Sequence, residues 1–283
     1  MIIQLPGISA VYYGLLQSGY DFYAPERSAG HIRDIGAYRG RELSNAFFSG
    51  ARQNTCEVYP YWPRAFIMES ASFFLNDSNT GFRDFGTLRR KILSAANISE
   101  RERDESLWEW LEGFPRAVAS VLSNSSFAGY LEWEKEWIAG QERIHRGEVS
   151  LIRECLETCT GRYHSPVREI RVCLNPIKCV YSADYHLADG CFIFSSGAFR
   201  TDSIIHEFLH HVVHPVVEER KAMILKRRPV NERLDDSYYL SGDNSGVLNA
   251  FEETVVRSLT EEVMNGKYPG DLSAYLESVL AEM

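Results

Sequence analysis

The segment from Thr201 to Pro215 reads TDSIIHEFLHHVVHP, and it decides the architecture expected for the second half of the chain. Its apolar residues recur at spacings of three and four, a pattern typical of an amphipathic helix. The Thr201-Asp202-Ser203 run offers residue types that cap a helix amino terminus. Pro215 predicts the end of the helix because proline has no backbone N–H to donate.

This predicted helix carries an HExxH motif at positions 206–210. Residues four apart on an α-helix point in directions only about 40° apart, so His206 and His210 share one face. Two neutral imidazoles placed in this way can occupy two corners of a zinc tetrahedron. The carboxylate of Glu207 follows the first histidine and can reach a metal-bound water. The motif therefore predicts a zinc site with Glu207 as general base.

A third metal ligand is expected from the next predicted helix, which begins near Ser245-Gly246 and continues to Val263. It carries two adjacent acids: Glu252 lies within the apolar stripe of this helix, and Glu253 lies near its edge, four residues before Arg257. From the residues alone, either acid is a candidate. His214 is a weaker one, because a straight helix cannot easily wrap ligands from three successive turns around one ion.

The sequence HEFLHHVVHPVV, followed downstream by FEETVVRSL, resembles zincin-like metallopeptidases of the glutamate-ligand (gluzincin) type. The likeness is greatest to uncharacterised bacterial zinc peptidases in which HEFxHxxVxP precedes a helix reading E-x-x-V-R. The resemblance covers about Ile193 to Thr260. It implies that the ligand Glu stands four residues before the Arg, which corresponds to Glu253, with Glu252 as the alternative.

The resemblance implies a zinc metallopeptidase that cleaves peptide bonds with a metal-activated water. His206, His210 and Glu253 would hold Zn²⁺, and Glu207 would accept the proton of the attacking water. Candidates for stabilising the transition state or supporting a ligand are Tyr238, Tyr239, His214 and Arg257. If the predicted strand Cys191–Phe194 lies at a sheet edge, an extended peptide could add to it as a further strand.

Two other classes of function are also consistent with the motif. The chain could be a peptide-binding protein of zincin fold without turnover, or a helical interaction protein with an incidental HExxH. The first predicts metal without hydrolysis, and the second predicts no stoichiometric metal. Hydrolysis of an amide or ester outside peptides would use the same water-activating groups.

The fold class predicted for the whole chain is α+β. A mainly helical region, 1–161, is expected to precede a zincin-like region, 162–283, with loops and one or two short helices in the first sixty residues. Three short strands are predicted at Arg168–Leu174, Ile177–Tyr181 and Cys191–Phe194, in a mostly antiparallel sheet. A last helix is expected at Asp271–Leu280.

Composition limits the partners. The 283 residues carry a net charge of −9, which argues against nucleic acid or an anionic membrane surface, since both reward clustered Lys and Arg. No apolar run approaches the roughly 18 residues of a membrane span, and the amino terminus does not resemble a secretory signal. Six cysteines without a CxxC pair indicate reduced thiols in a cytoplasmic protein. The expected partner is a peptide or protein substrate.

Overall fold

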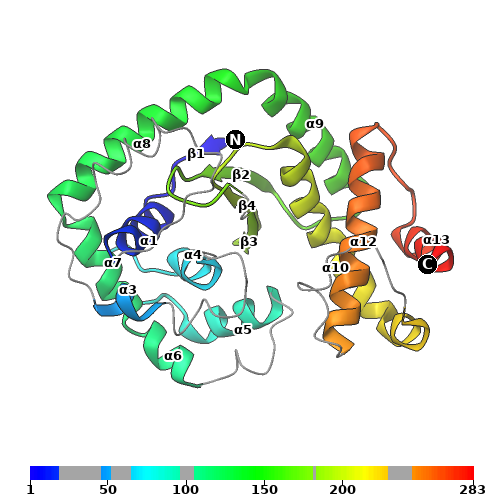
Figure 1. Ribbon diagram of the computed structural model, residues 1–283, viewed down its shortest axis with the longest axis horizontal. Helices are drawn as coiled ribbons and strands as arrows, with labels where there is room; N and C mark the ends of the chain where they lie inside the picture. Colours follow the sequence, from blue (N-terminus) through cyan, green and yellow to red (C-terminus); the bar gives the residue numbers. More distant parts are fainter. Residues whose placement is uncertain (19–45, 52–64, 96–104, 181–182, 229–243) are drawn as a thin grey trace. The chain divides into compact units, whose positions relative to one another are not determined.

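The computed structural model describes residues 1–18, 46–51, 65–95, 105–180, 183–228 and 244–283. These residues form an α+β protein in which helices predominate (Figure 1). The helices are α1 (Pro6–Gln17), α3 (Ala46–Ala51), α4 (Phe66–Ser72), α5 (Phe85–Ala95), α6 (Glu105–Leu111), α7 (Phe114–Leu122), α8 (Ser125–Ile144), α9 (Arg146–Arg162), α10 (Thr201–Arg227), α12 (Asn244–Met264) and α13 (Leu272–Glu282). None of them combines the length and apolar character needed to cross a membrane.

The described strands form one mixed four-stranded sheet. They are β1 (Ile2–Ile3), β2 (Glu169–Leu174), β3 (Asp184–Ala188) and β4 (Cys191–Ser196), arranged in the order β1-β2-β4-β3. β1 pairs with β2 in parallel, whereas β3 and β4 form an antiparallel hairpin. Asp189 and Gly190 both have positive φ in the turn of this hairpin, which suits the twist of the flanking strands.

Two expectations about the sheet are wrong. Residues 177 and 178 do not belong to a strand, because the backbone N–H groups of Ile177 and Lys178 donate to the side-chain oxygen of Asn175 in a local turn. β4 lies between β2 and β3, so Cys191–Phe194 is not an edge strand. A peptide therefore cannot add to β4, because both of its edges are already paired.

Contacts group the chain into two compact units. One contains Met1–Ile144 and Arg171–Phe199, and the other contains His145–Ile170 and Arg200–Met283. The expected boundary at Gly161 lies inside α9. Neither unit begins or ends at this residue, and each unit is made of two separate segments of the chain. The second unit contains α10, α12 and α13. It therefore holds both helices from which the metal ligands were predicted.

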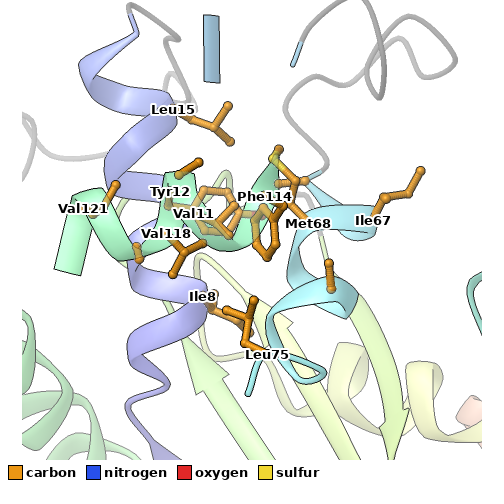
Figure 2. Packing of buried hydrophobic residues seen from close by; sticks show 14 of the residues in the cluster. Ile8, Val11, Tyr12, Leu15, Ile67, Met68, Leu75, Phe114, Val118 and Val121 are labelled. Carbon is orange, nitrogen blue, oxygen red and sulfur yellow. The ribbon is translucent and has the colours of Figure 1, made fainter. Parts of the chain in front are cut away.

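The first unit is built around α1, which begins with a proline that suits a first helical turn. Figure 2 shows Tyr12 of α1 near Phe114 of α7 and Met68 of α4. All three side chains are fully buried. Trp108 of α6 is buried in the same hydrophobic core. These aromatic side chains pack between helices, as their spacing in the sequence indicates.

A network of buried charges lies beside this core. The ammonium of Lys178 donates to Glu69 of α4 at 2.7 Å and to Asp184 of β3 at 2.8 Å, with no side-chain exposure in any of the three. His186 bonds to the other oxygen of Glu69, at 2.8 Å, and to Ser70, at 2.9 Å. Burial alone raises the pKa of Glu69, but Lys178 and His186 outweigh it and hold that pKa well below its usual range.

Removing the cation of this network should strongly destabilise the protein. For Lys178→Met we expect a loss of about 3–5 kcal/mol in the free energy of unfolding, because two buried carboxylates lose their positive partner. Chemical denaturation measures the loss. Lys221→Met is the matched control, since the Lys221 side chain on α10 is mostly exposed. Equal, small losses in both variants would contradict the prediction.

A second buried acid, Glu134 of α8, has hydrogen-bond donors but no cation among its partners in the described part of the chain. Its carboxyl accepts from Gln4 at 2.7 Å, Ser9 at 2.6 Å, Tyr130 at 3.0 Å and Asn175 at 2.9 Å. Burial raises the pKa of Glu134 to about 7, although the bonds from Ser9, Gln4 and Tyr130 lower it. Because burial disfavours the charged form, the folded protein binds this proton more tightly than the unfolded chain does. Protonation of Glu134 therefore stabilises the fold.

This raised pKa predicts how stability depends on pH. The stabilisation by protonated Glu134 is fully present below its unfolded pKa near 4.5 and is lost as pH rises through about 7. Relative to Glu134→Gln, the wild type should lose about 3 kcal/mol between pH 4.5 and 7.5. Denaturation curves of both proteins across this range measure the difference. A constant difference would contradict the assignment.

The second unit confirms the predicted helices but corrects the end of α10. Pro215 does not stop this helix, which continues to Arg227 and is capped by Arg228 in a left-handed conformation. Pro215 lies on the exposed side, whereas Val217 and Ile224 beyond it are buried. Burial of these later turns offsets the backbone hydrogen bond that the proline cannot make. The predicted helix end at Pro215 is therefore wrong, because the helix continues for twelve residues beyond it.

The other predictions, on helix caps and on cysteines, have mixed outcomes. α13 begins at Leu272, and the Asp271 side chain caps it by accepting from the N–H groups of Ser273 and Ala274. Thr201-Asp202-Ser203 form the first turn of α10, whose N-cap is Arg200, and within that turn Asp202 accepts from the N–H of Ser203. Among the described residues, the cysteines at 155, 159, 173, 179 and 191 are free thiols.

Candidate metal centre

Helices α10 and α12 lie side by side in the second unit (Figure 1). The apolar side chains Phe208, Leu209 and Val213 of α10 are buried, as are Phe251 and Val255 of α12. Leu209 and Val213 lie about one helical turn apart, as do Phe251 and Val255, and Phe208 adjoins Leu209, so each set lies along one side of its helix. Packing of these apolar faces fixes how the polar residues between them meet.

The structure brings His206, His210 and Glu253 together. His206 Nε2 lies 3.1 Å from His210 Nε2 and 3.4 Å from Glu253 Oε2, and the distance from His210 Nε2 to Glu253 Oε2 is 3.2 Å. Two atoms that each lie about 2.0 Å from a tetrahedral zinc ion are roughly 3.3 Å apart. The three atoms are therefore spaced like three ligands of one small metal ion, and this group could hold one.

Glu252 turns its carboxylate to the opposite side of the His210 ring. Glu252 Oε1 lies 2.8 Å from His210 Nδ1, and Glu252 Oε2 lies 2.8 Å from His214 Nδ1. Of the two adjacent acids, Glu253 faces the shared point between the imidazoles and Glu252 does not. His214 likewise contacts Glu252 rather than the ligand group.

Arg257 holds the second oxygen of Glu253. Its Nε donates to Glu253 Oε1 at 2.6 Å, which leaves Oε2 directed toward the two imidazoles. About half of the Arg257 side chain is exposed. The contact fits the spacing of four residues on one helix, and it orients Glu253 toward the histidines.

The site concentrates negative charge away from water. Glu252 and Glu253 are both buried. Among the described residues, Arg257 is the only permanently charged side chain in contact with either carboxylate. Burial raises the pKa of each acid, but hydrogen bonds from the imidazoles outweigh it and lower both. Burial lowers the pKa of His210, yet Glu252 and Glu253 raise it to about 10. A dication would supply the positive charge that the ring protons otherwise provide.

The remaining predicted residues have different positions. Glu207 is partly buried on α10, and its charge also raises the pKa of His210. His211 lies off the ligand face, as expected, with its Nε2 2.9 Å from the Ser165 hydroxyl. Tyr238 and Tyr239 lie outside the described residues.

Reasoning from the sequence treated Glu252 and Glu253 as competitors for one role. In the structure the two acids make different contacts, because adjacent helical residues point about 100° apart. The sequence feature that could have indicated a contact for the second acid is the series of histidines at intervals of four, His206, His210 and His214. A carboxylate packed beside such a series can form hydrogen bonds to two of the imidazole rings at once.

Comparisons with protein-family models, with curated proteins and with solved structures found no match to this chain.

Proposed function

We propose that this protein is a zinc-dependent hydrolase, and specifically a metallopeptidase. The observation that carries the proposal is the spacing of 3.1 to 3.4 Å among the metal-facing atoms of His206, His210 and Glu253. Glu207 follows the first of these histidines on the same helix. Two histidines one turn apart and a glutamate from the next helix are the ligand types that the resemblance to gluzincins implies.

The donor set favours zinc over calcium or magnesium. Two imidazole nitrogens and one carboxylate oxygen suit a borderline ion in a tetrahedral site, whereas calcium and magnesium take mainly oxygen ligands. Three protein ligands leave a fourth position, as in catalytic rather than structural zinc sites. Such a site binds an ion and still admits a substrate.

The residues of the chain divide the remaining work. When bound, zinc supplies Lewis acidity and lowers the pKa of a coordinated water toward about 7. Glu207 accepts the proton of the attacking water and then delivers it to the leaving amine. Arg257 keeps Glu253 aimed at the imidazoles by occupying its other oxygen. Peptides are the proposed substrates because the resemblance is to peptidases.

The test is metal content followed by cleavage profiling. Protein purified without added ions should contain about one zinc per chain, measured by elemental analysis. It should then cleave members of a mixed peptide library, with products identified by mass spectrometry. Zinc without cleavage would favour a peptide-binding protein of the same architecture. No stoichiometric metal, even after incubation with zinc, would overturn the proposal.

A further inference from the structure

We infer that Glu252 is a positioning residue for the metal site, which it serves by fixing the ring of His210 from behind and by anchoring itself to His214. The inference rests on metal binding at the proposed site. It assigns to Glu252 a role separate from ligation. It also gives His214 a function, as the residue that holds Glu252 in place.

The first step is the orientation of the His210 ring. A carboxylate at 2.8 Å from Nδ1 requires a proton on that nitrogen, because two acceptors cannot share a hydrogen bond without one. With Nδ1 protonated and donating to Glu252, the neutral ring keeps its lone pair on Nε2. Nε2 is the atom that faces Glu253 and His206. Glu252 thus selects the tautomer that a metal needs.

The second step is the anchoring of Glu252 itself. One carboxylate oxygen is bound to His210 and the other to His214, one helical turn further along α10. The Glu252 side chain is 9% exposed, so there is little water to replace either bond. Because both oxygens are engaged, the carboxylate cannot rotate without breaking a buried hydrogen bond.

The third step is the contribution of charge. A carboxylate behind a ligating imidazole makes that ring a better donor to the metal, and removing such a partner typically weakens metal binding by 10–100-fold. Glu252 lies within the apolar stripe of α12, where a buried acid is costly unless it has partners. Bridging His210 and His214 explains why an acid occupies this position.

The experiment compares zinc affinity among variants by competition with a chelator. Glu252→Gln can still accept from His210 and donate to His214, so it preserves shape while removing the charge. We expect its zinc affinity to fall about tenfold, and that of Glu252→Ala about 100-fold. The zinc affinity of His214→Ala should lie between those of the wild type and Glu252→Ala. Glu219→Gln, at an exposed position of α10, should bind zinc like the wild type.

A second measurement separates positioning from simple helix packing. In cobalt-substituted protein, visible absorption reports the field of the ligands, so Glu252→Gln should shift the spectrum while the metal-free variant stays folded. Lower stability without any change in zinc affinity or cobalt spectrum would overturn the inference and leave the proposed function standing. If the wild type fails to bind zinc, the proposed function itself falls, and this inference falls with it.

Discussion

Replacing His206 with alanine is expected to abolish stoichiometric zinc binding. His206 supplies one of three ligand atoms whose mutual distances fit a single ion, and removing it leaves only two protein ligands. Changes to groups that merely orient a ligand already cost 10–100-fold in metal affinity, so loss of a ligand should exceed about 100-fold. Elemental analysis and chelator competition on the purified variant measure the loss.

The matched control for this experiment is His211→Ala on the same helix. His211 is also a partly buried histidine of α10, but its ring contacts Ser165 and not the ligand group. It should therefore retain zinc at the wild-type level. If both variants retained zinc, or if both lost it, His206 could not be assigned as a specific ligand.

Replacing Glu207 with glutamine should separate metal binding from chemistry. The amide keeps the size of the side chain but cannot accept a proton, and Glu207 is not among the three ligands. We expect zinc content to stay at one per chain while the hydrolysis rate falls by about 10²–10⁴-fold, the usual contribution of a positioned general base. Turnover on a peptide identified by the cleavage profile measures the change.

Glu219→Gln provides the comparison for that result, because it makes the same chemical change at an exposed residue of α10. Its zinc content and turnover should both equal those of the wild type. Undiminished turnover in Glu207→Gln would remove the general base from the mechanism. Loss of zinc in that variant would instead mean that Glu207 supports the site and not only the reaction.

Much of the site could be predicted from local rules. The α-helical period by itself places His206 and His210 on one face, and the resemblance indicated that the third ligand comes from the next helix, α12. The resemblance pointed to Glu253 rather than Glu252, and Glu253 is the acid that lies with the two histidines. The first of these predictions depends only on neighbours within one helical turn, whereas the others carry over what the resemblance implies.

The errors arose where distant packing or a local side-chain hydrogen bond overrides the usual preference of a residue. Pro215 usually ends a helix, but the buried Val217 and Ile224 carry α10 through it. The run Ile177–Tyr181 has the composition of a strand, yet Asn175 draws the backbone at residues 177 and 178 into a turn. Lys178 then reaches the buried acids Glu69 and Asp184, and nothing in the local sequence reveals those partners.

The sequence alone determined the one-turn separation of His206 and His210, because that distance follows from the pitch of a single helix. Only the tertiary structure decided which acid lies with the Nε2 atoms of these two histidines and which one contacts Nδ1 of His210. That choice depends on the rotation of α12 about its axis relative to α10. The rotation is set by the combined burial of apolar side chains along both helices, and no individual residue encodes it.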